Sequence, residues 1–320
     1  MIKNNICVLG GGRWGLNHIK TLFSMKINNV GCVDNDHLQL KKIKSLFPKT
    51  NCFKSLKDSL DSNFDGYIIA TPPFTHADLA CKIIALNKPI LVEKPLCLSI
   101  AELNKIKFYI EKYNGKLLVG HLLLFHPAIQ KIKKIIDSGM IGKIQYMYSN
   151  RLNVGIVRKE ENVLWSFAPH DVSIFQFLSK SFPEQVHSNG ISFLQKNIHD
   201  VVMTSLKYKN GIKGHIFSSW VHPFKEHRLI VIGTKGAICF EDSSKEKEII
   251  FYDKKIKINN KSIILENLPF KKIKYKSSSP LENELQYFLR YIKGEKNNLA
   301  GIKEGGDVIQ ILEMANKTLR

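Results

Sequence analysis

The sequence predicts an α/β fold in which a doubly wound parallel sheet is followed by a second, strand-rich α+β domain. Short apolar runs alternate with helix-like segments through the first third of the chain, a pattern typical of a parallel sheet covered by helices. A glycine cluster joins the first apolar run to the first helix. Beyond about residue 121, apolar and polar residues alternate along strands, which favours a sheet with one covered face.

Local sequence patterns predict the strands and helices of the first domain. The runs 6–9 and 30–33 are apolar and suit strands buried on both faces. Ser99 and Glu102 form a capping box that predicts the start of a helix. The predicted strands cover 6–9, 30–33, 51–53, 66–71, 89–93 and 116–120, and the predicted helices cover 16–23, 36–47, 75–86 and 99–113, with another from Ser55.

The second domain begins near His121 with one helix over about 127–138. Its predicted strands are 144–154, 184–196, 200–209, 213–221, 226–234 and 237–241, interrupted by a helix over about 171–179. Two helices, from about Leu281 and Ile302, end the chain. We therefore expect two domains, the first over 1–120 and a second, α+β domain over 121–320.

The stretch GGGRWG fits the pattern G-x-G-x-x-G through Gly10, Gly12 and Gly15. The pattern alone is weak, but here a strand precedes it and a helix follows it. Gly10 permits the tight turn, Gly12 lets the backbone approach a pyrophosphate, and Gly15 allows close packing of the helix. The helix N-terminus offers unpaired N–H groups to the anion. Arg13 and Trp14 lie inside this turn and are expected beside the cofactor.

The second buried strand ends at Asp34, close to the expected distance after the glycine turn. Its carboxylate can accept hydrogen bonds from both ribose hydroxyls. A 2′-phosphate would instead meet a negative charge, and the next residues offer no arginine. The sequence therefore predicts NAD as the cofactor, with NADP less favoured.

The composition narrows the classes of function. Lys and Arg number 48 against 28 Asp and Glu, a net charge of +20 that invites a nucleic-acid hypothesis. Only six of these cations are Arg, and the lysines are scattered along amphipathic segments, so we expect no nucleic-acid partner. The six cysteines form no C-x-x-C pair, and no apolar run approaches the length of a membrane span. We expect a cytoplasmic protein with no membrane association and no bound metal.

Two polar loops follow apolar strands, at the edge where open α/β sheets bind ligands. The first carries Thr71, Pro72, Pro73 and His76, and the second carries Glu93 and Lys94 before a proline. We place all six in the cofactor site. Lys94 can hold a substrate hydroxyl and stabilise oxyanion charge. The alternative interpretations are a solvated turn for Glu93 and Lys94, and a plain helix start for His76.

In this order, the blocks GGGRWG, ATPPFTH, LVEKPLCLS, VGHLLLFHPAI and PLENELQYFLRYIKG resemble the Gfo/Idh/MocA oxidoreductase family over essentially the whole chain. The resemblance implies an NAD(P)-dependent enzyme with an N-terminal Rossmann domain. It also implies that 1–120 form the dinucleotide-binding domain, and that 121–320 form a substrate-binding and oligomerisation domain with a large, mostly antiparallel open-faced sheet. One face of that sheet would cover the substrate pocket, and the other would form a homodimer or homotetramer.

A narrower resemblance concerns RLNVGIVR, LWSFAPHD and SWVHPFK, which are similar to relatives that oxidise nucleotide-activated amino sugars, typically at C3, in surface-polysaccharide synthesis. It implies that Lys94 and His170 are the catalytic residues. It also implies that the substrate, a UDP-sugar, contacts Lys94, His170, Arg151, Asn153, Arg158 and Trp165. Arginine suits a diphosphate or uronate because its planar fork binds two oxygens at once.

Ser166 departs from the family pattern, which has an Asp four residues before the histidine. Serine can orient the imidazole of His170 by a hydrogen bond but adds no charge. Asp171 is adjacent, and we expect it to cap the following helix.

Two other hypotheses stay open at this point. One is a dehydrogenase of a free polyol or sugar, of the inositol or glucose type, for which an arginine clamp is unnecessary. The other is a non-catalytic NAD-binding regulatory or assembly protein, which Ser166 supports.

Overall fold

The computed structural model describes residues 4–253, 256–259, 262–265 and 270–319. The chain forms two compact units. The first contains residues 1–125 and 278–309, and the second contains 126–277 and 310–320. The chain therefore returns to the first unit after completing most of the second. The division at residue 120 drawn from sequence stays a prediction.

The first unit is built on a six-stranded parallel sheet with the strand order β3-β2-β1-β4-β5-β6. Its strands are β1 (Asn5–Leu9), β2 (Asn29–Val33), β3 (Asn51–Phe53), β4 (Gly66–Ile69), β5 (Ile90–Glu93) and β6 (Leu117–Gly120). Every residue of β4, β5 and β6 is buried, as their apolar sequences predict. The order reverses between β1 and β4, which is the switch point where such sheets bind ligands.

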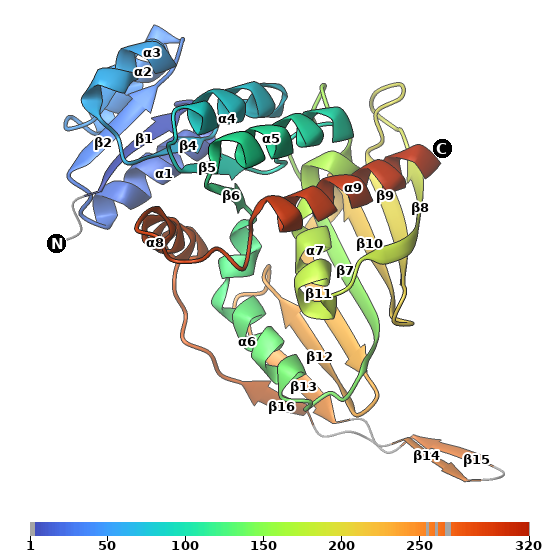
Figure 1. Cartoon of the computed structure of the whole chain (residues 1–320). Helices are drawn as coiled ribbons and strands as arrows, with labels where there is room; N and C mark the ends of the chain where they lie inside the picture. Colours follow the sequence, from blue (N-terminus) through green and yellow to red (C-terminus); the bar gives the residue numbers. More distant parts are fainter. Residues whose placement is uncertain (1–3, 254–255, 260–261, 266–269, 320) are drawn as a thin grey trace. The chain divides into compact units, whose positions relative to one another are not determined.

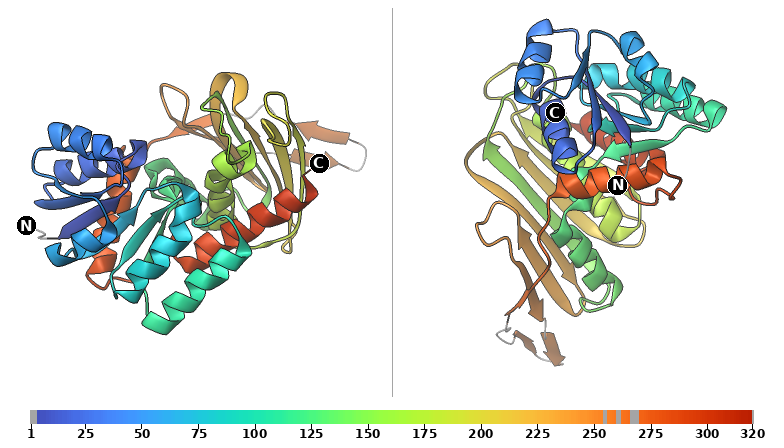
Figure 2. Two further views of the ribbon diagram at one scale, coloured as in Figure 1. Left: turned by 90° about the horizontal axis from the view of Figure 1, so that it is seen from above. Right: turned by 90° about the vertical axis from the view of Figure 1, so that its left-hand side faces the viewer.

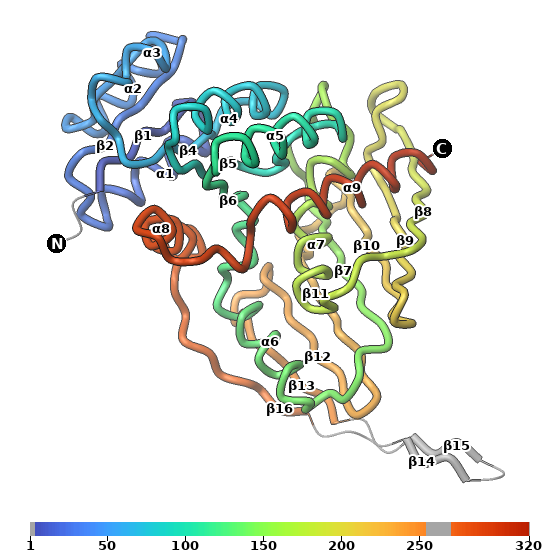
Figure 3. The backbone as a smooth tube through the Cα atoms, viewed as in Figure 1, coloured from blue at the N-terminus to red at the C-terminus, as the bar shows by residue number. Residues whose placement is uncertain are grey.

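Helices connect these strands, and Figure 3 traces the first connection from β1 through α1 to β2. They are α1 (Arg13–Ser24), α2 (His37–Leu46), the short α3 (Leu56–Ser59), α4 (His76–Ala85) and α5 (Ile100–Tyr113). Asp36 caps α2 and Ser99 caps α5 through their side chains. Helices α4 and α5 pack against each other, side by side in Figure 1. Single turns lie at η1 (Leu60–Ser62), η2 (Pro73–Thr75) and η3 (Leu122–Phe125).

The first unit is completed by α8 (Pro280–Ile292) and by the first part of α9 (Ile302–Thr318). Helix α8 packs against α1 and η3. On α9, a Cβ added at Gly305 would lie 2.5 Å from the side chain of Val119, so the helix lies very close to β6. The segment before α9 and the start of α9 thus border β6, where the N–H of Val119 donates to the carbonyl of Ala300 at 2.8 Å.

The second unit contains an eight-stranded sheet with the order β16-β13-β12-β11-β7-β10-β9-β8, antiparallel except for the β7–β10 pair. Its strands are β7 (Ile144–Val154), β8 (Pro183–Ile191), β9 (Val201–Tyr208), β10 (Lys213–Ser219), β11 (Val221–Gly233), β12 (Gly236–Glu241), β13 (Ile249–Asp253) and β16 (Phe270–Ile273). The strands β14 (Ile256–Asn259) and β15 (Ser262–Leu265) pair separately.

Two helices, α6 (Pro127–Asp137) and α7 (Val163–Ser179), lie along one face of this sheet (Figures 1 and 2). Alternation along β9 buries Val202, Thr204, Leu206 and Tyr208 and exposes the residues between them. The predicted fold class is therefore confirmed in both parts: a doubly wound parallel sheet, and a mostly antiparallel sheet with one covered face.

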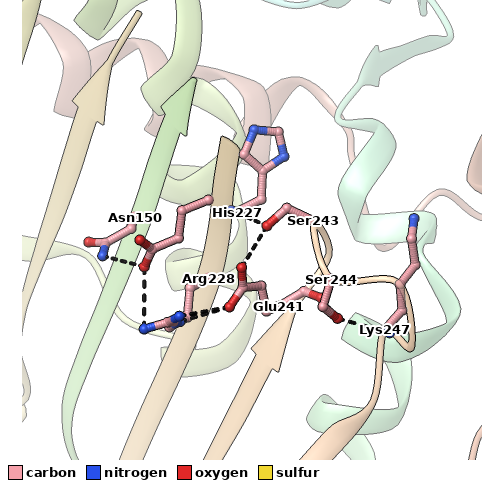
Figure 4. Close-up of polar contacts among 8 residues, drawn as sticks. Asn150, His227, Arg228, Glu241, Ser243, Ser244 and Lys247 are labelled. Atoms are coloured by element: carbon pink, nitrogen blue, oxygen red, sulfur yellow. Dashed lines mark hydrogen bonds and ion pairs between the residues drawn. The ribbon is translucent and has the colours of Figure 1, made fainter. Parts of the chain in front are cut away.

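A polar network occupies the other face, where β7, β11 and β12 run side by side (Figure 4). Arg228 donates from Nε and Nη2 to Glu241, and its Nη1 lies 3.4 Å from Glu226. Asn150 donates to the same Glu226 carboxylate at 2.8 Å. This network therefore connects side chains of three neighbouring strands on the open face.

One predicted helix is wrong in its length. The sequence suggested a helix over about 171–179, but α7 begins at Val163, where the Asn162 side chain accepts from the N–H of Trp165. Pro169 lies inside the helix and does not interrupt it. An interior proline lacks its own N–H, and its ring crowds the carbonyl group four residues earlier. Burial of most of α7 offsets both costs.

Candidate active site

The glycine turn between β1 and α1 has the geometry that its sequence predicts. Gly10 has φ +93°, and a Cβ there would lie 2.8 Å from the carbonyl oxygen of Ala70. A Cβ at Gly15 would lie 1.8 Å from the carbonyl oxygen of Gly10, so no larger residue fits between α1 and the turn. In contrast, a Cβ at Gly12 would meet nothing within 4 Å. Gly12 therefore borders open space at the start of α1.

The N-terminus of α1 receives no hydrogen bond from the side chain of its N-cap residue, because that residue is Gly12. Arg13 and Trp14, the first two residues of the helix, are exposed. The first turn of α1 thus presents main-chain N–H groups and a cation at the same end of the helix. This arrangement fits the pyrophosphate of a dinucleotide.

Asp34 lies directly after β2 and turns its carboxylate toward the glycine turn. Oδ2 accepts the N–H of Gly11 at 2.6 Å, and Oδ1 accepts the N–H of Asp36 at 2.9 Å. Each oxygen keeps a further lone pair, so the carboxylate can still accept from ribose hydroxyls. Its negative charge at this place opposes a 2′-phosphate and favours NAD.

The loop after β4 is held by His76, whose ring is 1 % exposed. Nδ1 lies 2.8 Å from the carbonyl oxygen of Pro95, and Nε2 lies 2.8 Å from that of Thr71. Burial lowers the pKa of His76, while these carbonyls and the charges of Glu93 and Glu102 act in the opposite direction. His76 therefore ties the two predicted cofactor loops together. Direct contact of His76, Thr71, Pro72 or Pro73 with the cofactor stays a prediction.

Glu93 and Lys94 lie at the carboxyl end of β5, and their environments differ. Glu93 is 8 % exposed, its Oε1 lies 2.7 Å from Nε2 of His18, and its Oε2 accepts the Lys94 N–H at 3.3 Å. Lys94 is half-exposed. The Glu93 carboxylate is thus buried and held by its contacts with His18 and the Lys94 N–H. Lys94 is partly exposed at the edge of the sheet where such folds bind ligands.

In the second unit, α7 carries three of the predicted residues, of which Trp165 and its neighbour Ser166 are buried and His170 is half-exposed. Ser166 and His170 are four residues apart on α7 and therefore share one face of the helix. The position of Ser166 thus suits an orienting role toward His170. This role stays a prediction.

Arg151 and Asp171 form a buried ion pair that the sequence analysis did not foresee. Arg151 donates from Nε at 2.5 Å and from Nη2 at 3.0 Å to the two oxygens of Asp171, which also accepts from Ser149. Arg151 is 8 % exposed and Asp171 is 1 % exposed. The expectation that Asp171 caps a helix is therefore wrong, because the residue lies inside α7 and joins that helix to β7.

The other predicted substrate residues differ in exposure. Arg158 is exposed, and its Nε lies 3.9 Å from Oε1 of Glu161. Asn153 is half-buried, and a Cβ at Gly155 would lie 2.4 Å from its Oδ1. Arg158 is thus open to an anion, whereas Arg151 already has a carboxylate partner. Contact of Arg151, Asn153, Arg158 or Trp165 with substrate stays a prediction.

Three buried polar residues near these positions were not singled out from sequence: His18, Glu284 and Asp200. Asp200 accepts from Nε1 of Trp220 at 2.5 Å and from the N–H groups of Phe193 and Leu194 at 2.6 and 2.8 Å. Sequence offered a signal only for His18, which lies three residues after Gly15 and so shares its face of α1.

Two family models match this chain. Residues 4–121 match a model described as an oxidoreductase family with an NAD-binding Rossmann fold, and residues 129–239 match the GFO/IDH/MocA C-terminal domain. Together they span more than half of the chain. The chain belongs to the Gfo/Idh/MocA oxidoreductase family. The family resemblance proposed from sequence is confirmed, and the predicted cofactor NAD agrees with the family description.

The relatives of this chain are named for different substrates. The scyllo-inositol 2-dehydrogenase (NAD(+)) of Bacillus subtilis is 28 % identical over 72 % of this chain and 72 % of its own length. The structure of UDP-N-acetylglucosamine 3-dehydrogenase GnnA from Acidithiobacillus ferrooxidans aligns with a TM-score of 0.85 at 18 % identity, covering 100 % of this chain and 98 % of that one. The structure of the WlbA dehydrogenase of Bordetella pertussis in complex with NADH and UDP-GlcNAcA aligns with a TM-score of 0.79 at 17 % identity. The alignment covers 99 % of this chain and 96 % of that one.

The chain is therefore an NAD-binding oxidoreductase, as predicted, and its dehydrogenase relatives act on CH–OH groups. Among the described residues, no helix combines the length and apolar character needed to cross a membrane. The non-catalytic hypothesis is not supported by membership of an oxidoreductase family.

Proposed function

We propose that this oxidoreductase oxidises a secondary hydroxyl, at C3, of a nucleotide-activated amino sugar used in surface-polysaccharide synthesis. The observation that carries the proposal is the half-exposed Lys94, at the same sheet edge as the open glycine turn and fixed through its neighbours Glu93 and Pro95. The structural likeness to two dehydrogenases of UDP-sugars supports the choice of substrate class.

In this proposal Lys94 donates a hydrogen bond to the reacting hydroxyl and stabilises the charge that develops on its oxygen. His170 takes the hydroxyl proton as general base, and Ser166 orients its ring from the same face of α7. NAD, when bound, would supply the acceptor for the hydride. The main-chain N–H groups at the start of α1 hold the pyrophosphate, and Asp34 holds the ribose.

Arg158 is the proposed ligand for the anionic groups of the substrate, because its guanidinium is exposed. Arg151 donates two of its groups to Asp171 and keeps Nη1 for a substrate oxygen. Asn153 and Trp165 complete the proposed substrate site.

A second candidate is a dehydrogenase of a free polyol. The ion pair of Arg151 with Asp171 favours it, because an arginine already neutralised is a weaker anion clamp. The 28 % identity to the scyllo-inositol dehydrogenase also favours it.

A panel of substrates separates the two. NAD is mixed with UDP-N-acetylglucosamine, UDP-N-acetylglucosaminuronate, myo-inositol, scyllo-inositol and glucose, and the absorbance of reduced nicotinamide is followed. We expect turnover of a UDP-sugar and competitive inhibition by UDP. Turnover of an inositol, with no inhibition by UDP, contradicts the proposal and supports the second candidate. The exposed Lys82 on α4 provides the control variant Lys82→Ala, expected to retain wild-type turnover.

We also propose a homo-oligomer that forms through the open face of the second sheet. This face carries the half-exposed rings of Tyr146, Tyr148 and His215, of which Tyr148 and His215 stack at 5.1 Å. The Arg228 network of Figure 4 lies on the same face. Sedimentation velocity of the wild type and of Tyr148→Glu tests this: we expect a dimer or tetramer that the substitution dissociates, and a monomeric wild type contradicts it.

A further inference from the structure

Four titratable side chains of the first unit converge near the carboxyl ends of β5 and β6. Glu93 ends β5 and pairs in register with Gly120, which is followed by His121. His18 reaches Glu93 from α1 at 2.7 Å. Glu284 lies on α8, which packs against α1, and is close enough to Glu93 for the two charges to interact. Lys94 is the next residue after Glu93, so the cluster adjoins the proposed catalytic lysine.

Within this cluster Glu93 has the environment of an ionised carboxylate. Its Oε1 lies 2.7 Å from a ring nitrogen of His18, and its Oε2 accepts the main-chain N–H of Lys94 at 3.3 Å. An ionised carboxylate is acceptor-only. The main-chain N–H of Lys94 donates to Oε2, and the His18 ring donates to Oε1 when its proton is on Nε2. Of the two carboxyl groups, Glu93 and Glu284, we therefore assign the negative charge to Glu93.

Glu284 has the opposite environment. Its side chain is 0 % exposed, and within the described part of the chain neither carboxyl oxygen has a hydrogen-bond partner. An ionised carboxylate there would lose its hydration without gaining a donor. Burial, and secondly the charge of Glu93, raise the pKa of Glu284 well above its usual range.

Among the described residues, neither His121 nor the turn η3 supplies a compensating positive charge to Glu284. His121 is fully buried, and neither ring nitrogen has a hydrogen-bond partner among the described residues. Burial, and then the charge of Lys94, lower the pKa of His121 to about 4, so this ring is neutral. The turn η3, which packs on α8, contains only Leu and Phe.

We propose that Glu284 is held as a neutral carboxylic acid at physiological pH and acts as a positioning residue, so that Glu93 alone carries a negative charge beneath Lys94. A second charge would compete with Glu93 for the His18 ring and would hold the Lys94 ammonium more tightly in its protonated form. The neutral acid thus sets the charge balance behind the lysine. The kinetic part of this inference rests on the proposed function, whereas the protonation state does not.

The protonation state is measured without substrate. Infrared difference spectra of the whole protein, recorded as a function of pH, report the carbonyl stretch of an un-ionised carboxylic acid. We expect this band at pH 7 in the wild type and in the control Glu282→Gln, which removes a half-exposed carboxyl two residues away on α8. We expect it to be absent in Glu284→Gln. Absence of the band from the wild type at pH 7 overturns the proposal.

A second variant keeps the test decisive if Glu284→Gln does not fold. Glu93→Gln removes the neighbouring charge, so the band of Glu284 should titrate at lower pH than in the wild type. An unchanged titration contradicts the shared charge balance.

The kinetic arm uses the substrate that the panel identifies. Glu284→Gln mimics the neutral acid and should keep kcat/KM within about threefold of wild type, with the same pH profile, whereas Glu93→Gln should lose on the order of tenfold or more. A loss of kcat in Glu284→Gln as large as in Glu93→Gln means that Glu284 acts in its ionised form and overturns the proposal. If no substrate is turned over, the proposed function fails while the infrared result still stands by itself.

Discussion

In the first unit the candidate site is made largely of main chain at strand ends, whereas in the second unit it depends on charged side chains buried between a helix and a sheet. The glycine turn leaves open space at Gly12 because Gly10 and Gly15 bring α1 close to β1 and β4. In the second unit, the strand residue Arg151 and the helix residue Asp171 pair where both are almost fully buried. A main-chain site tolerates changes in most side chains, while a site built on a buried ion pair depends on two.

The largest expected effect concerns the two proposed catalytic residues, one in each unit. Lys94→Ala and His170→Ala should each lower kcat by roughly 10²–10⁴-fold, because each removes a group that acts on the reacting hydroxyl. NAD binding, measured by calorimetry, should stay within about threefold of wild type, because the glycine turn and Asp34 are unchanged. Full activity in either variant shows that the unit concerned does not supply the assigned catalyst.

Breaking the ion pair tests whether the second unit depends on it. Asp171→Ala leaves Arg151 buried without its carboxylate and should lower the free energy of unfolding by about 3–5 kcal/mol, measured by chemical denaturation. The double variant Arg151→Met with Asp171→Leu should recover most of that loss, because it leaves no unpaired charge. A loss below about 1 kcal/mol in Asp171→Ala contradicts the contrast between the two units.

The buried His121 makes the stability of the first unit depend on pH. The buried His121 has a pKa of about 4 when folded, against 6.5 when unfolded. Between these values only the unfolded chain binds the proton, so this contribution is complete above pH 6.5 and is lost as the pH falls toward 4. The loss is on the order of 3 kcal/mol. Denaturation curves recorded from pH 7 to pH 4 should show that the free energy of unfolding falls less steeply in His121→Leu than in the wild type. An equally steep fall contradicts a lowered pKa for His121 in the folded protein.

A smaller effect separates two glycines of the same turn. Gly15→Ala forces a Cβ against the carbonyl of Gly10 and should lower the free energy of unfolding by roughly 1–3 kcal/mol. Gly12→Ala meets no atom within 4 Å and should lose less stability than Gly15→Ala, about 0.5–1 kcal/mol from the poorer N-cap of α1, while weakening NAD binding. Equal stability losses in the two variants, or unchanged NAD affinity in Gly12→Ala, argue against the turn as the phosphate cradle.

The same contrast explains what could be predicted from the sequence. The strands, the turn and Asp34 are specified by residues close together in the chain, and the spacing of Gly10, Gly12 and Gly15 predicts their distinct environments. The Arg151–Asp171 pair joins residues 20 apart, and the Glu93–Glu284 interaction joins the first third of the chain to its last part. Tertiary packing brings these residues together, and local sequence patterns do not predict contacts between residues so far apart in the chain. The early start of α7 was missed for the same reason, since burial of the helix keeps Pro169 inside it.

The most direct test of the proposed chemistry is transfer of an isotope label. UDP-N-acetylglucosaminuronate and UDP-N-acetylglucosamine carrying deuterium at C3 are incubated with the protein and NAD, and the reduced cofactor is analysed by mass spectrometry. The account predicts reduced nicotinamide with one deuterium and a substrate ketone at C3, both lost in Lys94→Ala. Unlabelled reduced cofactor contradicts C3 as the site of oxidation, and no reduction with either substrate contradicts a nucleotide sugar as the substrate.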